Sequence, residues 1–473
     1  MRKTLLTLAI ATALSGCIVS RVDPQKPELP LPDSLPAAQR ETVQLPDPWW
    51  TLFGDPVLNQ LVDEGLANNT DVAIAAARVA QARAALRSTN ANRLPSLDLG
   101  ANANRAKSST DIVAAPGVER TQTSYTVQGA VGFELDLWGR YQRASESARA
   151  QLLNTEYGRE ATKLALTGDL TRGYFALIAA AEQLARGRDT LATREESLRL
   201  EKLRLDAGES DEFTYQRAAA DAEATRTSVY QLELEVTRRV TALGVLLGRS
   251  PKDLVERAIL TSEVDLPVPV ALPAALPSSV MAARPDIGAA EAALNAAAAD
   301  IGVARAELFP RISLTGAFGS ASRELGDLFT EPTQAWSAAA GLMQPIFQGG
   351  RLRANVARTE AVREQRKAEY ARTVQQAFRE VLDALNGQRL IESVRTSSSA
   401  QVSALSRATE LAELRYEQGD IAYLELLDVR RGLYQAQISL VAAQRDALLN
   451  TVDLALAVGG GLGERAEALS SRR

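Results

Sequence analysis

The chain contains no histidine and only one cysteine among its 473 residues. Histidine is the commonest general base and the commonest transition-metal ligand in proteins, so its absence removes both. The sequence also has no nucleotide-binding loop and no metal-ligand spacing, which leaves no set of residues that could carry catalysis. We therefore expect a protein that is not an enzyme and that holds no cofactor or metal.

Aromatic residues are scarce as well, at 5%, whereas hydrophobic residues make up 46% and are mainly Ala, Leu and Val. This composition suits long packed helices better than a globular α/β enzyme. The formal net charge is −5, so no basic surface is expected to attract nucleic acid. Beyond the N-terminus there is no run of about 18 consecutive apolar residues, and we expect no transmembrane helix.

The N-terminus has the features of a secretion signal. Arg2 and Lys3 precede an apolar run over residues 5–14, which is too short to span a membrane as a mature helix. The small residues Ser15 and Gly16 stand directly before Cys17, which resembles the lipobox of bacterial lipoproteins. The resemblance implies removal of residues 1–16 and lipidation of Cys17 at the outer membrane. The alternative is an ordinary secretory signal with an incidental cysteine.

A proline-rich segment follows, with seven prolines between residues 18 and 48. Proline at this density prevents helix formation and favours an extended chain. We predict that residues 17–54 form a lipidated arm that wraps a larger body. Folding proper is expected to begin near Trp49 and at the pair Asp55-Pro56, which favours helix initiation.

The rest of the chain is duplicated. At an offset of 215 residues, Asp71, Pro95 and Leu97 recur as Asp286, Pro310 and Ile312. Further along the chain the offset is 211 residues, and Arg204, Gly208, Leu243 and Gly248 recur as Arg415, Gly419, Leu454 and Gly459. The change of offset is expected where residues 137–140 recur as residues 346–351. The period is far too long for a solenoid, so each copy is a large supersecondary assembly. We predict repeats over residues 55–263 and 264–460 and a tail over 461–473.

Each repeat contains two long proline-free segments, which we predict form an antiparallel helical hairpin. The two hairpins span about residues 139–250 and 350–459. Leucines repeat at strict intervals of seven from Leu170 to Leu205, which indicates coiled-coil packing. The companion positions are small or polar: Tyr174, Ala181, Arg188 and Glu195. We therefore predict a narrow apolar stripe and not a helix with a two-sided core.

Before each hairpin, apolar and polar residues alternate with the period of a β-strand. Two strands are expected within about residues 95–138 and two within about 310–347, the last of them (335–342) with a weaker pattern. A half-buried soluble sheet could explain this pattern. The secretion signal and the small polar residues on the other face favour outer-membrane strands instead. Four strands are too few to close a barrel, and lipid does not tolerate open edges, so several copies must complete one barrel.

Together these features resemble the TolC-type outer membrane factors. The joints at residues 136–140 and 345–351 carry part of the resemblance, and the lipobox, Trp49-Trp50 and residues 284–287 point to the lipoprotein (NodT- or OprM-like) branch. The resemblance implies an α+β membrane protein that forms a homotrimer. Four strands from each chain would form a 12-stranded outer-membrane barrel, continuous with a periplasmic tunnel of antiparallel coiled-coil helices. It also implies two partners, a periplasmic adaptor and an inner-membrane pump of the RND type.

The resemblance assigns an adaptor-binding role to the turns between the long helices. These turns carry Arg204 and Gly208 in the first repeat and Arg415 and Gly419 in the second. A glycine at such a place can supply the positive φ of a helix end. Two ordinary glycine helix ends are the alternative reading.

The resemblance also implies a gate just after the second turn, where family members carry rings of an apolar and an acidic residue. The matching positions are Leu424 and Asp428, which lie on one helical face. Asp428 could instead pair with Arg431 or face water. The first repeat has Phe213 and Arg217 at these positions, so it cannot supply a second acidic ring.

The function implied by the resemblance is a passive exit duct of a tripartite efflux system for drugs or other small toxic compounds. The duct of a type I protein-secretion system would share the fold, but such relatives usually lack the lipid anchor. A lipidated coiled-coil scaffold of the envelope would leave the alternating strands unexplained. The sequence does not name the cargo, because a wide duct need not select it.

Overall fold

The computed structural model describes residues 22–30, 46–109, 120–256, 266–267 and 284–461. The predicted signal peptide, Cys17 and nearly all of the predicted tail lie outside these residues. The chain divides into two compact units, and each unit draws on both sequence repeats. The first unit comprises Met1–Pro27, Val79–Thr155 and Ala290–Tyr370, and the second comprises Glu28–Arg78, Glu156–Ala289 and Ala371–Arg473.

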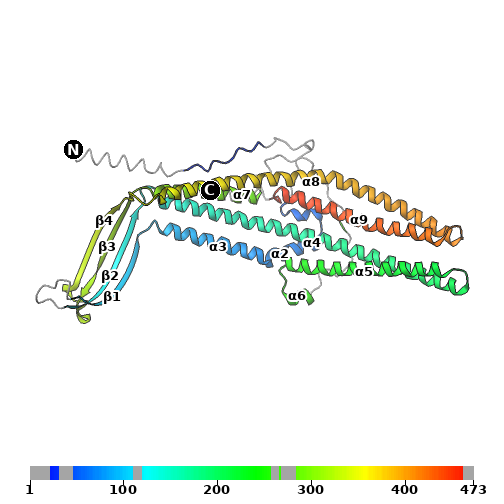
Figure 1. Cartoon of the computed structure of the whole chain (residues 1–473), viewed down its shortest axis with the longest axis horizontal. Coiled ribbons are helices and arrows are strands. Elements are labelled where there is room, and N and C mark those ends of the chain that lie inside the picture. Colours follow the sequence, from blue (N-terminus) through cyan, green and yellow to red (C-terminus); the bar gives the residue numbers. More distant parts are fainter. Residues whose placement is uncertain (1–21, 31–45, 110–119, 257–265, 268–283, 462–473) are drawn as a thin grey trace. The chain divides into compact units, whose positions relative to one another are not determined.

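The first unit contains one four-stranded antiparallel sheet in the order β1-β2-β3-β4 (Figure 1). Its strands are β1 (Ser96–Lys107), β2 (Thr121–Leu135), β3 (Arg311–Ser322) and β4 (Gln334–Met343). All four predicted strands are thereby confirmed, including the last one with its weaker pattern. Strands β1 and β4 are the two edges of this sheet.

The register of the sheet places the apolar positions of all four strands on one face. Leu97 lies opposite Val131, and Leu314 lies opposite both Phe133 and Ala340. Directly opposite residues of antiparallel strands share a face. The other face carries small and polar residues, among them Asn102, Thr126, Gln128, Ser313 and Thr315. The apolar face is open in the single chain, where the side chain of Leu97 is 78% exposed.

The strand pairing corrects the predicted position of the offset change between the repeats. Leu97 pairs with Val131, and its counterpart Ile312 pairs with Leu342. Strands β2 and β4 therefore already match at an offset of 211. The prediction was wrong because it aligned two apolar pairs at the joints, whereas backbone pairing sets the correspondence. The four-residue difference lies between the two strands of each pair, and Ile346-Phe347 is not the counterpart of Leu137-Trp138.

The two strand-to-helix joints are packed differently. At the first joint, the ring of Trp138 stacks on Phe309 with centroids 4.9 Å apart, and its Nε1 donates a hydrogen bond to the carbonyl oxygen of Pro310 at 2.7 Å. At the second joint, Ile346 and Phe347 are each 88% exposed. The second joint therefore has a free apolar surface in the single chain.

Two very long helices begin at these joints. They are α4 (Arg140–Ala207) and α8 (Arg351–Glu417), and each would be about 100 Å long at 1.5 Å per residue. They continue unbroken because neither contains proline. Each is followed by a shorter helix, α5 (Glu212–Leu246) or α9 (Tyr423–Ala457), which confirms the two predicted hairpins (Figure 1). The other helices among the described residues are α2 (Pro56–Asn68), α3 (Thr70–Ala91), α6 (Pro251–Glu256) and α7 (Pro285–Ala306), with short 3-10 turns at Trp49–Phe53, Leu325–Asp327 and Glu331–Thr333.

The long helices end in the same backbone motif in both repeats. Gly208 and Gly419 have φ values of 77° and 80°. The N–H group of the following residue donates to a carbonyl oxygen five residues earlier, from Glu209 to Arg204 at 2.8 Å and from Asp420 to Arg415 at 2.9 Å. This is the Schellman motif, which satisfies carbonyl groups at a helix end and requires a left-handed residue. The predicted positive φ of both glycines is confirmed.

The aromatic residues just before α2 pack in the core of the second unit. The hydroxyl group of Tyr174 donates to Oδ2 of Asp55 at 2.7 Å. The other oxygen of Asp55 accepts from the first N–H groups of α2, so this side chain caps the helix and fastens it to α4. Trp49 is buried in the same cluster and donates its Nε1 hydrogen to Oγ1 of Thr167 at 3.2 Å. Burial and the bond to Asp55 raise the pKa of Tyr174.

The leucine stripe of α4 is confirmed in its part further from the turn at Gly208, where Leu170 and Leu177 are buried. The predicted narrow stripe holds toward the turn but not further from it, where the companion residue Tyr174 is fully buried. Arg188 and Glu195 lie at the surface and form ion pairs with α5, to Glu233 and Arg226 at 2.7 Å each. From Ala180 toward the turn, the buried seam lies one residue earlier in each heptad, at Ala180, Gly187, Arg194 and Glu201.

One helix differs from expectation in composition. Helix α7 is long and apolar enough to cross a membrane, whereas the sequence analysis expected no such helix. Most residues of its apolar segment are buried inside the chain, and Leu294 and Ile301 are fully buried. Its alanine-rich sequence therefore suits close packing between helices.

Candidate functional site at the turns of the helical hairpins

The predicted gate residues lie on a free face at the start of α9. Tyr423, Leu426 and Leu427 pack inward and are buried. Leu424 is 53% exposed, and Asp428, one turn further along, is also exposed. Among the described residues, Asp428 has neither a hydrogen bond nor an ion pair. The structure thus presents an apolar and an acidic side chain together, with no partner from their own chain.

The alternative pairing of Asp428 with Arg431 is not formed. The guanidinium group of Arg431 instead binds Asp221 on α5, with Nε 2.7 Å from Oδ1. At the matching positions of the first repeat, the guanidinium carbon of Arg217 lies 5.8 Å from the ring centre of Phe213, and Phe213 is exposed. The two hairpins therefore present different chemistry at equivalent places.

The four predicted tip residues are in different surroundings. Gly208 and Gly419 occupy the turns described above. Arg415 is exposed and has no partner in the part of the chain that the structure describes. Arg204 is half-buried and bonds Glu201 at 3.2 Å and the hydroxyl group of Tyr416, so it joins the first hairpin to the second.

A partly buried ion cluster joins three helices near the turns. We call Arg194, Asp221 and Arg431 the triad. Nε of Arg194 on α4 lies 2.9 Å from Oδ2 of Asp221 on α5, and Nη2 of Arg431 on α9 lies 2.7 Å from Oδ1. Arg194 and Asp221 are buried, and burial lowers the pKa of Arg194 although Asp221 opposes this shift. The triad ties the second hairpin to the first through a desolvated carboxylate.

A second polar cluster lies closer to the turns and centres on Glu201 of α4, which is only 3% exposed. Its carboxylate accepts hydrogen bonds from the hydroxyl groups of Tyr416 at 2.6 Å and Ser210 at 3.1 Å. Burial and the bond to Glu201 raise the pKa of Tyr416. The rings of Tyr416 and Tyr423 are 5.8 Å apart, which continues the contact to α9.

A third link runs from Arg430 on α9. Its guanidinium group donates to Oε1 of Glu413 on α8 at 2.8 and 3.0 Å and to Oγ of Ser197 on α4 at 3.0 Å. The two hairpins are thus fastened to each other by charged groups over about two turns of helix. Sequence analysis missed these residues because charged residues on a long helix are usually solvated. The available signal was the heptad spacing of Arg194 and Glu201 below Gly173, Ala180 and Gly187.

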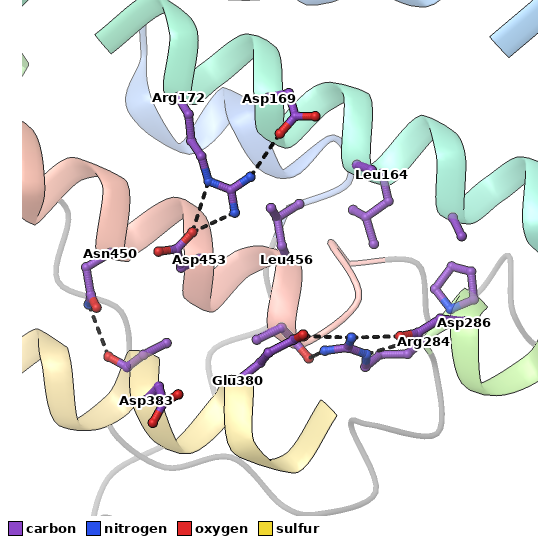
Figure 2. Close-up of a pocket in the computed structure, with 15 residues that line it drawn as sticks. Leu164, Asp169, Arg172, Arg284, Asp286, Glu380, Asp383, Asn450, Asp453 and Leu456 are labelled. Atoms are coloured by element: carbon purple, nitrogen blue, oxygen red, sulfur yellow. Dashed lines mark hydrogen bonds and ion pairs between the residues drawn. The ribbon is translucent and has the colours of Figure 1, made fainter. Parts of the chain in front are cut away.

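The second unit also contains a cavity of about 540 Å³ (Figure 2). Most of its charged lining residues are paired with one another. Arg284 bonds Asp286 and Glu380 at 2.8 Å each and the carbonyl oxygen of Ala457 at 2.9 Å. Arg172 bridges Asp169 and Asp453. We interpret the motif that begins at Arg284 as a buried structural connection between the starts and ends of helices. No group of potential metal ligands was found among the described residues.

Comparisons with known proteins agree in sequence and in fold. The sequence profile of the family described as "Outer membrane efflux protein" matches residues 61–249 and 276–460. The chain is 35% identical to outer membrane protein OprJ of Pseudomonas aeruginosa over 97% of this chain and 95% of OprJ. It is 36% identical to the solvent efflux pump outer membrane protein SrpC of Pseudomonas putida, over 86% of each chain.

A third relative has a solved structure. The chain is 32% identical to the cation efflux system protein CusC of Escherichia coli K12, over 97% of this chain and 99% of CusC. A crystal structure of CusC superposes with a TM-score of 0.82 and 30% identity, covering 93% of this chain and 99% of that one. The similarity therefore includes the sheet, both hairpins and their turns.

The triad yields a stability prediction. Replacing Asp221 with Ala should lower the free energy of unfolding by about 3–5 kcal/mol, because Arg194 would remain buried without a counter-charge. The matched control is Glu195→Ala, which removes an exposed ion pair from the same helix region and should change stability by less than about 1 kcal/mol. Denaturant unfolding followed by circular dichroism measures both. Equal effects of the two changes would contradict the assigned role of the triad.

Proposed function

Because this chain belongs to the outer membrane efflux protein family, we propose that it forms the exit duct of a tripartite efflux system. The chain is an outer-membrane channel, and its work is to let small compounds leave through a continuous passage. In this proposal it acts as a homotrimer, together with a periplasmic adaptor and an inner-membrane pump of the RND type. One relative is named for solvent efflux and another for cation efflux, although both resemble this chain over most of its length. In this proposal the pump, and not the duct, therefore selects the chemical class of the cargo.

The observation that carries the proposal is the open sheet of the first unit. It has an exposed apolar face, a polar face, and two edges, β1 and β4, that pair with no other described strand. In a bilayer, each unpaired backbone group costs several kcal/mol, so only a closed barrel is stable there. Three copies supply twelve strands, with apolar side chains toward lipid and polar ones toward the lumen.

The proposed gate is a threefold ring of Asp428 with a ring of Leu424 one helical turn away. Three carboxylates around a narrow axis repel one another and attract cations, and the leucines exclude water from the constriction. The exposed face of α9 supports this role, since Leu424 and Asp428 are exposed there and Asp428 has no hydrogen bond or ion pair within the described part of the chain. The buried links between the hairpins hold α9 in place and would keep the rings narrow in the absence of partners.

The turns at Gly208 and Gly419 are the proposed contact with the adaptor. Both turns have exposed side chains, and the side chain of Arg415 has no partner among the residues that the structure describes. Arg204 would act indirectly, because its bonds to Glu201 and Tyr416 pass any movement of the first turn to the second hairpin. Lipidation of Cys17 is proposed as an additional anchor beside the barrel.

The lipid-facing side of the sheet can be tested by charge insertion. Val131→Arg and Leu314→Arg should destabilise the assembled protein by roughly 2–4 kcal/mol if the residues lie near mid-bilayer. Gln128→Arg and Thr315→Arg, on the other face of the same strands, are the controls and should be tolerated better. The yield and heat resistance of the trimer in detergent report the effect, and native mass spectrometry reports the trimer itself. A stable folded monomer of the parent chain would refute the proposed barrel.

The gate predicts a change in conductance. Partner-free protein in a planar bilayer should conduct poorly and prefer cations. The double change Leu424→Ala with Asp428→Ala should raise conductance or admit large antibiotics such as vancomycin, with the trimer unchanged. The matched control is Phe213→Ala with Arg217→Ala at the equivalent place in the first repeat. Unaltered conductance and cation preference in the gate variant would show that Leu424 and Asp428 do not form the constriction.

The anchor is tested by mass. The mature protein should begin at Cys17 and exceed the mass of the 17–473 polypeptide by three fatty acyl chains and a glycerol. Cys17→Ser with a working signal peptide should affect membrane retention less than loss of the barrel, because the strands themselves remain embedded. An unmodified N-terminus on the mature parent protein would disprove the lipidation.

A further inference from the structure

The apolar face of the sheet changes character toward the strand ends that are far from the helices (Figure 1). On β1 this face is apolar from Leu97 to Ala103 and then carries Arg105 and Lys107. Both basic residues are exposed, and neither side chain has a hydrogen bond or an ion pair within the described part of the chain. Two cations therefore stand on the face that the proposed barrel turns toward lipid.

Hydroxyl groups lie next to these cations on the neighbouring strand. Arg105 lies opposite Thr123 and Lys107 opposite Thr121, and Tyr125 is the next residue on the same face of β2. Cβ atoms of directly opposite residues are about 5 Å apart, so these five side chains form one group, which we call the donor cluster. It contains no carboxylate, and guanidinium, ammonium and hydroxyl groups all donate hydrogen bonds. Such a set suits an anion with several acceptor oxygens, above all a phosphate group.

The position of the donor cluster along β1 matches the headgroup level of a membrane. Leu97 is the first apolar residue of this strand, and Arg105 and Lys107 lie eight and ten residues beyond it. At a rise of about 3.3 Å per residue and a tilt of about 40°, these distances correspond to roughly 20 and 25 Å across the membrane. The apolar band of an outer-membrane barrel is about 25 Å tall, and basic residues near its edge cost little. Their long side chains can extend from there into the headgroups.

The leaflet follows from the direction of the helices. In the proposed duct the helices extend into the periplasm, and both strand connections lie at the opposite end of the sheet (Figure 1). The donor cluster is beside the β1–β2 connection and therefore belongs to the outer leaflet. A phosphorylated lipid in that leaflet would place its acyl chains along the apolar part of the same face.

The second repeat has no equivalent of the donor cluster. At an offset of 215 residues, Ser320 and Ser322 of β3 match the two cations of β1. The connection after β3 carries three carboxylates and one guanidinium group, from Arg323, Glu324, Asp327 and Glu331. The charge of that connection would repel a phosphate group. We therefore expect one lipid site in each chain, on the side of β1 and β2.

We propose that the donor cluster binds the phosphate groups of the lipid in the outer leaflet of the outer membrane. This inference rests on the proposed barrel and goes beyond it by assigning a specific lipid site to each chain. The guanidinium group of Arg105 can bind two phosphate oxygens at once, whereas Lys107 acts as a compact charge. The hydroxyl groups of the cluster donate to the remaining oxygens.

Native mass spectrometry of detergent-purified trimers tests the site. The probe is lipid A with two phosphate groups, and the comparison probe is the same lipid with one phosphate group removed. The test variant combines Arg105→Gln with Lys107→Gln. The matched control combines Arg120→Gln with Arg323→Gln, which removes two charges from the same end of the sheet but leaves the donor cluster intact. The exchanged pair, Arg105→Lys with Lys107→Arg, keeps both charges in place.

The parent trimer should bind up to three copies of lipid A. Its affinity should fall by about tenfold or more in the test variant, and should stay within about threefold in the matched control and the exchanged pair. Removal of one lipid phosphate should weaken binding to the parent but not to the test variant, because the test variant no longer has the cations that bind the phosphate. The same spectra report whether each variant is still a trimer.

Equal affinity of the parent and the test variant, an equal loss in the matched control, or no effect of the lipid phosphate on the parent would overturn the site. Pairing of the two cations with Asp111 or Glu119, which lie outside the described residues, predicts the last of these outcomes. If the test variant fails to assemble, the phosphate dependence of the parent and the exchanged pair still decides. A parent trimer that binds neither lipid would overturn this inference alone, whereas absence of a trimer would overturn the proposed barrel as well.

Discussion

A backbone amide at the edge of a sheet has no water to hydrogen-bond inside the hydrocarbon of a bilayer. This constraint determines whether the four-stranded sheet of one chain can be stable in a membrane. Its strands are long enough to cross a bilayer when tilted, yet one chain leaves both β1 and β4 without partners. A single copy is therefore an incomplete membrane protein. The need for edge pairing fixes the assembly of the barrel, and the barrel in turn brings the long helices of three chains around one axis.

Side-chain packing and charged pairs, and not backbone pairing, hold the long helices together. Small residues on the inner seam of α4, such as Gly187, allow close approach to α5 and α9, where an added Cβ would meet side chains of both helices. Nearer the turns the same seam changes to Arg194 and Glu201. Apolar packing joins the hairpins further from the turns, whereas paired charges join them near the turns, where the cost of desolvating each charge offsets part of the attraction.

Much of this architecture could be predicted from local sequence patterns. Alternation with a period of two located the strands, and the absence of proline located α4 and α8, because both signals are read within a short window. The contacts of Asp221 could not be predicted in this way. Its partners Arg194 and Arg431 come from two other helices, and charged residues on a helix surface look the same whether they face water or one another. Backbone pairing was likewise needed to find where the repeats change offset, because the joints contain similar residues in different positions. The lipidation of Cys17, the repeat boundaries and the roles of Leu424, Asp428 and the tip residues stay predictions.

The triad has no copy in the second repeat. The residues that match Arg194, Asp221 and Arg431 at an offset of 211 are Leu405, Gly432 and Ala220. Side-chain atoms of Leu405 would lie 3.6 Å from a Cβ at Gly432, so an apolar contact stands where the first repeat has an ion pair. A trimer therefore contains six similar hairpins but three triads. The sixfold pseudosymmetry of the duplicated chain is lowered to threefold near the turns, where the Arg194–Asp221 ion pair of the first hairpin alternates with the apolar Leu405–Gly432 contact of the second.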